Sequence, residues 1–142
     1  MLLRLAQELD LPAVIHSREA YSDTLNILHE ENQGGLKGVL HCFSGDMELA
    51  NAALEMGLLV SFTGNITFPK ADIIRQAAKE IPLDKIMLET DCPFLAPQAN
   101  RGQRNEPAYV IQVAEIIAEI KSLSTEEVAR VTTQNARGLF NI

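Results

Sequence analysis

The sequence KGVLHCFSGD at residues 37–46 decides the fold, because it joins a short strand to a helix through a histidine. Residues 37–40 form a short segment of the kind found in strands that are buried on both faces of a sheet. Ser44 or Asp46 can then accept hydrogen bonds from the free amides at the start of the next helix. His41 is therefore expected at the carboxyl end of a strand, directly before a turn into a helix.

The same alternation of short apolar runs and helical patterns continues along the whole chain. Strands are predicted at 13–15, 37–40, 58–62 and 86–88, and helices at 1–9, 19–31, 46–56, 70–80, 107–120 and from 124 onward. At the last helix, Ser124 followed three residues later by Glu127 predicts a capping box. Short buried strands separated by helices predict an α/β fold with a parallel sheet and right-handed crossovers. The length predicts one domain over residues 1–142.

Composition restricts the classes of function. The 12 basic and 19 acidic side chains give a net charge of −7, which argues against binding nucleic acid through a broad basic face. A nucleic-acid enzyme whose site is made positive by metal ions stays open. No apolar run approaches the roughly 18–20 residues of a membrane span, so no membrane partner is expected. The two cysteines lack a CxxC spacing and the N-terminus lacks a secretory pattern, which predicts a cytoplasmic location.

Polar side chains gather at the carboxyl ends of the predicted strands. His16 and His41 end two neighbouring strands, and Glu89 and Asp91 follow another. Parallel strands end side by side, roughly 4.8 Å apart, so these groups can meet. Two imidazoles and a carboxylate suit Zn²⁺, Mn²⁺ or Mg²⁺. The plainer alternative is a set of polar strand ends, with the acids capping the next loop. However, two acids two positions apart repel unless a cation or a proton intervenes.

Other polar residues have simpler interpretations. His29 lies within a helical segment and is expected on the surface. Cys42 and Cys92 each follow a candidate ligand, and strand alternation predicts small buried hydrophobic residues turned away from the metal. Arg104 lies in a glycine-bearing loop, as a solvated side chain or as a bidentate phosphate ligand. Gly64 lies in a strand-to-helix loop, where glycine permits a tight turn.

Several motifs, in this order, resemble the C-terminal half of the TatD family of metal-dependent deoxyribonucleases. They are IHSREA at 15–20, HCFSG at 41–45, SFTG at 61–64, ETDCPFLAP at 89–97, RNEP at 104–107 and the segment 135–140. The resemblance extends over essentially the whole chain. It implies a (β/α)8 barrel of the amidohydrolase type that binds two divalent metal ions and hydrolyses phosphodiester bonds.

The resemblance also implies roles for individual residues. His16 and His41 match the two family histidines that bind the more exposed metal ion. Asp91 matches the aspartate that binds the other ion and orients or deprotonates the attacking water. Glu89 matches a position beside these ligands that supports them. Arg18 and Arg104 are expected near the substrate, and the metal is expected to be Mg²⁺, Mn²⁺ or Zn²⁺.

The chain departs from the family pattern in its missing ligands. The family begins with an HxH motif and has a bridging glutamate on a middle strand, whereas the only histidines here are His16, His29 and His41. A (β/α)8 barrel typically needs about 250 residues, and this chain supplies four strands. We therefore expect half a barrel that holds one metal ion or none, whereas the intact family site holds two. A missing N-terminal half or a second copy would cover its open side.

The expected activity is that of a deoxyribonuclease, as an exonuclease on single-stranded DNA. The same scaffold also supports other ester or amide hydrolysis, such as D-aminoacyl-tRNA deacylation, and the fold cannot choose between these reactions. A third alternative is a catalytically dead fragment, because part of the metal site is absent.

On the inner face of the expected half barrel, four apolar side chains are expected to need cover: Val14, Val39, Leu59 and Met87.

Overall fold

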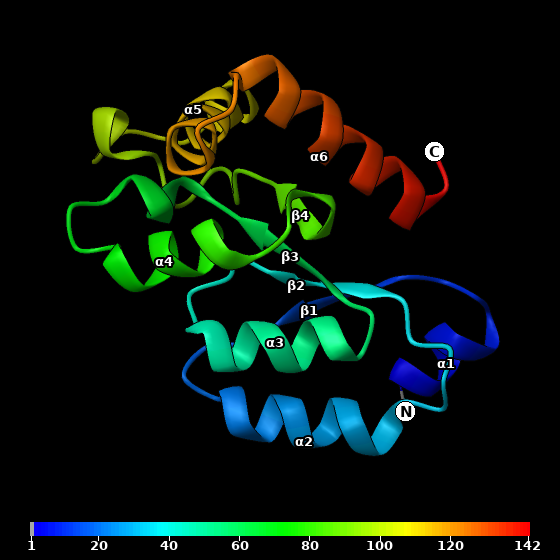
Figure 1. Ribbon diagram of the computed structural model, residues 1–142. Coiled ribbons are helices and arrows are strands. Elements are labelled where there is room, and N and C mark those ends of the chain that lie inside the picture. Colours follow the sequence, from blue (N-terminus) through cyan, green and yellow to red (C-terminus); the bar gives the residue numbers. More distant parts are fainter. Residues whose placement is uncertain (1) are drawn as a thin grey trace.

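The computed structural model describes residues 2–142 as a four-stranded parallel sheet flanked by helices (Figure 1). The strands are β1 (Ala13–His16), β2 (Gly38–His41), β3 (Leu59–Phe62) and β4 (Ile86–Leu88), in the order β1-β2-β3-β4. Each strand pairs in parallel with the next along the chain. The predicted α/β class and all four strands are confirmed, with boundaries that shift by at most one residue at either end.

Within residues 2–142, six α-helices and four short 3-10 helices precede, connect or follow the strands. The α-helices are α1 (Leu2–Glu8), α2 (Tyr21–Glu31), α3 (Met47–Glu55), α4 (Asp72–Glu80), α5 (Val110–Lys121) and α6 (Thr125–Phe140). The 3-10 helices are η1 (Gly64–Thr67), η2 (Leu83–Lys85), η3 (Gln98–Asn100) and η4 (Pro107–Tyr109). Sequence periodicity missed η1, η2 and η3 and merged η4 with α5, because a single 3-10 turn is too short to show a period. Across residues 2–142, every helix falls short of the length and apolarity needed to cross a bilayer.

Two helices begin at the side chains that the sequence offers as caps. Asp46 accepts from the amide of Leu49 at 3.1 Å at the start of α3. Ser124 accepts from the amide of Glu127 at 3.1 Å at the start of α6. The predicted capping box is only half formed, because the Glu127 carboxylate pairs with Arg130 at 2.7 Å. A charged donor one turn along α6 competes successfully with the backbone amide of Ser124.

The main core lies between the sheet and the helices on its outer face. Alternate strand residues point into this layer and are almost fully buried, among them Leu40, Val60, Phe62 and Ile86. Consecutive helices from α2 to α6 contact one another, so they form a continuous layer along the sheet (Figure 1). This layer leaves the carboxyl ends of the strands together at one edge.

The inner face of the sheet is only partly open. Val14 on the edge strand β1 is 60% exposed, as expected for half a barrel. The expectation is wrong for Val39 and Met87, which are only 3% and 8% exposed. Val39 is shielded because its register partners Val14 and Leu59 flank it on both sides. Met87 is the register partner of the buried Ser61 on β3.

Candidate active site

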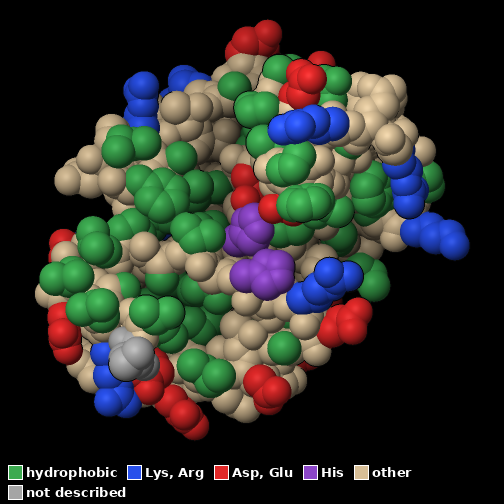
Figure 2. Space-filling model, turned by 180° about the vertical axis from the view of Figure 1, so that it is seen from behind, with side chains coloured by type: hydrophobic (Ala, Val, Ile, Leu, Met, Phe, Trp, Pro, Cys, Tyr) green, Lys and Arg blue, Asp and Glu red, His purple; other side chains and the backbone are tan. Residues whose placement is uncertain are grey.

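Two histidines end the neighbouring strands β1 and β2. His16 and His41 are register partners, and their ring centroids lie 5.7 Å apart with planes tilted by 39°. His16 is exposed, whereas the side chain of His41 is only 19% exposed. Figure 2 shows two adjoining histidines at the surface, bordered by acidic and apolar side chains. The shared strand edge therefore brings the two imidazoles together, as the sequence predicts.

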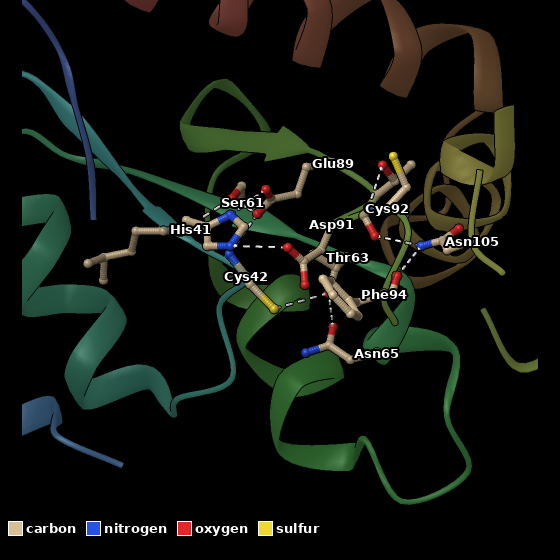
Figure 3. A network of polar contacts seen from close by, with 12 residues as sticks. His41, Cys42, Ser61, Thr63, Asn65, Glu89, Asp91, Cys92, Phe94 and Asn105 are labelled. Carbon is tan, nitrogen blue, oxygen red and sulfur yellow. Dashed lines mark hydrogen bonds and ion pairs between the residues drawn. The ribbon is translucent and has the colours of Figure 1, made fainter. Parts of the chain in front are cut away.

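Glu89 anchors the ring of His41 from the side of β4. Its Oε2 atom lies 2.5 Å from Nδ1 of His41. Its Oε1 atom accepts from the backbone amide of Cys42 at 2.6 Å and from the hydroxyl of Ser61. Figure 3 shows groups from the end of β2 and from β3 meeting the carboxylate of Glu89. Both oxygens of Glu89 are thus engaged within the protein.

Asp91 approaches the same ring from the opposite nitrogen. Its Oδ1 atom lies 3.6 Å from Nε2 of His41 (Figure 3). Asp91 has a φ of +57°, in the left-handed region that Asp enters more readily than most residues. Glu89 and Asp91 therefore face one imidazole through different nitrogens. The predicted crowding of two acids is relieved, because Glu89 is surrounded by hydrogen-bond donors.

The loop after β4 is held by Asn105, which is 2% exposed. Its Nδ2 atom donates to the carbonyls of Thr90 at 2.7 Å and Phe94 at 2.6 Å. The amide of Phe94 donates in turn to the carbonyl of Asp91 at 2.9 Å. Because buried polar atoms need partners, this network favours one conformation of the loop that carries Asp91.

A glycine permits the same loop to pack closely over η1. A Cβ atom on Gly64 would lie 2.4 Å from the carbonyl oxygen of Leu95 and 2.9 Å from the nitrogen of Pro97. The φ of Gly64 lies outside the left-handed region. The requirement for glycine therefore comes from the approach of the Leu95 backbone, rather than from the turn conformation that the sequence suggested.

The two cysteines occupy different environments. Cys42 is half-buried, and its Sγ atom lies 3.4 Å from the hydroxyl of Thr63. Burial raises the pKa of the Cys42 thiol, and the nearby carboxylates of Glu89 and Asp91 add to this effect. Cys92 is exposed, so its predicted burial is wrong. Strand β4 ends at Leu88, and alternation between the two faces does not extend to residue 92.

Two further candidates, Arg18 and Arg104, lie in loops that follow the strand ends, whereas His29 lies on a helix. Arg18 is exposed two residues after His16, in the turn that leads to α2. Arg104 is exposed beside the buried Asn105, in the loop that supports Asp91. His29 is exposed on α2, which confirms its interpretation as a surface residue.

The donor types at this edge fit one side of a divalent metal site. Two atoms that each bind one ion at about 2.1 Å lie at most about 4.2 Å apart. The 3.6 Å between Nε2 of His41 and Oδ1 of Asp91 satisfies this limit. Within residues 2–142, however, no three His, Cys, Asp or Glu side chains converge as a metal-binding group. The chain therefore presents part of a donor set.

Comparison with known proteins places these features in a family. The family model described as TatD related DNase matches residues 1–141. The chain belongs to the TatD family. This match agrees with the resemblance of the strand-end motifs, and it covers both histidines and the ETD segment.

Members of the TatD family resemble this chain over about half of their own length. The chain is 47% identical over 140 residues to the metal-dependent hydrolase YabD of Bacillus subtilis. This alignment covers 99% of the chain and 55% of YabD. It is 41% identical over 138 residues to human deoxyribonuclease TATDN3, covering 97% of the chain and 48% of that protein. The crystal structure of YJJV, a TatD homologue from Escherichia coli, superposes with a TM-score of 0.91 at 30% identity, covering 99% of this chain and 54% of that one.

These matches confirm the expected fold class, four parallel strands and flanking helices that correspond to half of a TatD barrel. Sequence reasoning missed Ser61 and Asn105 as parts of the site. Ser61 carried one usable signal, a hydroxyl on an otherwise apolar buried strand. Asn105 carried none beyond its place in the RNEP motif, because its partners are backbone carbonyls.

Proposed function

We propose that this chain carries one side of the active site of a divalent-metal-dependent hydrolase that cleaves phosphodiester bonds in DNA. The observation that carries the proposal is the pair of atoms Nε2 of His41 and Oδ1 of Asp91, set 3.6 Å apart at the carboxyl edge of a parallel sheet. Barrel enzymes of this class place their chemistry at that edge. The names of YabD and TATDN3, a metal-dependent hydrolase and a deoxyribonuclease, support the same reaction class.

In this proposal, His16, His41 and Asp91 are the metal ligands that this chain supplies. Bound divalent ions would polarise a phosphate and lower the pKa of a water molecule. The carboxylate of Asp91 is placed to accept a proton at Oδ1, and Glu89 keeps the His41 ring in place. The guanidinium groups of Arg18 and Arg104 can hold non-bridging phosphate oxygens. The positive charge of the ions reconciles an acidic chain with an anionic substrate.

The substrate that we propose is single-stranded DNA, attacked from an end, and the location is the cytoplasm. Two free cysteines, Cys42 and Cys92, fit a reducing compartment. We propose that residues 1–142 form one partial domain whose open inner face is covered by an N-terminal half or by a second copy. The exposed Val14 at the edge of β1 supports the need for such cover.

A cleavage assay tests the proposal. The chain is incubated with end-labelled single-stranded DNA and Mg²⁺ or Mn²⁺, with and without EDTA, and with charged tRNA as a second substrate. Cleavage of DNA that requires both the metal and His41 supports the proposal. Deacylation of the tRNA without DNA cleavage would instead assign an ester hydrolase. An inactive but folded chain would contradict activity in the chain alone and indicate a catalytically dead fragment.

A further inference from the structure

Glu89 contacts three polar groups, which lie at the end of β2, directly after it, and on β3. Its Oε2 atom faces Nδ1 of His41 at 2.5 Å, and its Oε1 atom receives the amide of Cys42 at 2.6 Å together with the hydroxyl of Ser61. Ser61 is 2% exposed, so its hydroxyl has little access to water. The arrangement is therefore built into the sheet, rather than formed by mobile surface side chains (Figure 3).

We propose that Glu89 is a positioning residue that holds His41 in the tautomer with its hydrogen on Nδ1. A neutral imidazole carries one N–H and one lone pair, and the partner of one nitrogen decides which is which. A carboxylate accepts and does not donate, so a nitrogen within hydrogen-bond distance of one must carry the hydrogen. Nδ1 lies at that distance from Glu89, whereas the 3.6 Å between Nε2 and Asp91 exceeds it. The lone pair of His41 is then on Nε2, the atom that faces Asp91 at 3.6 Å.

The backbone next to His41 is held by the same carboxylate. Cys42, whose amide reaches Glu89, has a φ of +51°, in the left-handed region that residues other than glycine rarely enter. The residue after His41 therefore adopts an uncommon conformation at the point where its N–H meets Oε1. Uncommon backbone conformations persist where surrounding interactions favour them.

The two acids of the ETD segment consequently have different roles. Glu89 uses both oxygens on protein donors, which leaves it poorly placed to bind an ion or a substrate. Asp91 keeps its carboxylate toward Nε2 of His41 and toward solvent, with 31% of its side chain exposed. The positioning of His41 has catalytic meaning only if the proposed metal-dependent function holds, whereas the tautomer is a property of the chain itself.

Nuclear magnetic resonance of the imidazole nitrogens tests the tautomer directly. The chain has only three histidines, so His16→Gln and His29→Gln variants assign all three rings. The metal-free protein is measured at about pH 8.5, above the ordinary imidazole pKa of about 6.5. We expect the Nδ1–H form to dominate for His41. A dominant Nε2–H form in the unmodified protein overturns the proposal, and this measurement needs no variant to fold.

Glu89→Gln then tests the cause. An amide can turn its NH2 group toward Nδ1, so the Nδ1–H form of His41 should lose its dominance while His16 and His29 remain unchanged. The matched control is Glu30→Gln, an exposed acid next to His29 on α2, which should leave all three tautomers unchanged. A folded Glu89→Gln protein with an unaltered His41 tautomer overturns the proposal.

Binding of Mn²⁺ alone, measured by the loss of the free-ion paramagnetic resonance signal, separates this inference from the proposed function. A supporting residue beside a metal ligand typically changes metal affinity about 10–100-fold, and we expect a loss of this size for Glu89→Gln. Lost affinity with an unaltered tautomer would make Glu89 itself a ligand and overturn its positioning role. A dominant Nδ1–H form without Mn²⁺ binding would uphold the tautomer and contradict the proposed function.

Discussion

The Nε2 atom of His41 lies 3.6 Å from the Oδ1 atom of Asp91, across the edge where β2 and β4 end. Strand β3 separates the strands that carry them, and the loop held by Asn105 brings Asp91 back toward the ring. A nitrogen and a carboxylate oxygen at this spacing can share one divalent ion. The proposed metal site therefore depends on two strands that are not paired with each other in the sheet.

Replacing His41 by alanine should remove one of these two atoms with little effect on the fold. We expect metal-dependent DNA cleavage to fall by at least about 100-fold. Loss of a residue that only supports a metal ligand reduces metal affinity or activity by up to about 100-fold, and loss of the ligand itself should reduce activity at least as much. The matched control is His29→Ala, because His29 is exposed on α2. Cleavage rates on end-labelled DNA and far-ultraviolet circular dichroism give the answer. Equal activity in the two variants would contradict the role of His41.

Gly64→Ala should destabilise the protein by about 1–3 kcal/mol, the usual cost of forcing extra atoms into a packed site. Its Cβ would lie 2.4 Å from the backbone oxygen of Leu95, which cannot move without displacing the loop after β4. Gly35→Ala is the control, since its Cβ would meet nothing within 4 Å. Urea unfolding measures both variants, and equal stability would show that the loop yields at no cost.

The two thiols should react at different rates. Burial raises the pKa of Cys42, so a smaller fraction is thiolate at neutral pH, and only the thiolate is nucleophilic. Cys92 is exposed. Under limiting iodoacetamide near pH 7.5, we expect Cys92 to be alkylated first, with the Cys42 reaction rising at more alkaline pH. Mass spectrometry of the Cys42→Ser and Cys92→Ser variants compares the rates, and faster labelling of Cys42 would contradict this environment.

The ion pair between α1 and α2 predicts a pH dependence of stability. Arg4 donates from Nε and Nη2 to the two carboxylate oxygens of Glu31 at 2.6 and 2.9 Å. This hydrogen bonding lowers the pKa of Glu31 from its ordinary value of 4.5. Because the pKa of Glu31 is lower in the folded protein than in the unfolded chain, the ion pair adds to the free energy of unfolding at pH values above the unfolded-state pKa. This contribution is lost as the pH falls through the folded-state pKa.

Glu31→Gln should accordingly reduce the free energy of unfolding at pH 7 and make no difference at a pH below the folded pKa of Glu31. Glu30→Gln, the exposed neighbouring position, is the matched control. Urea unfolding at a series of pH values measures the difference for each variant. Because both partners lie at the surface, the effect should shrink in high salt. A difference that persists unchanged at acid pH would show that the ion pair is not its source.

Much of the fold could be read from local pattern. The runs ending at His16 and His41 predicted both β1 and β2, because short apolar segments between helical repeats have few other solutions. The HCFSG and ETDCPFLAP motifs indicated the family before any contact was known. The buried state of Val39 could not be predicted in this way, since it depends on side chains of β1 and β3 that lie beside it only in the folded sheet.

The residues of the candidate site, and their place at the carboxyl edge of the sheet, follow from sequence pattern alone. The strand ends place His16, His41 and the ETD acids on one side of a parallel sheet. Which nitrogen of His41 meets which carboxylate is a matter of tertiary structure. It depends on the left-handed turns at Cys42 and Asp91 and on donors from Ser61 and Asn105. These groups are distant along the chain, and hydrogen bonds depend on distances that no local periodicity encodes.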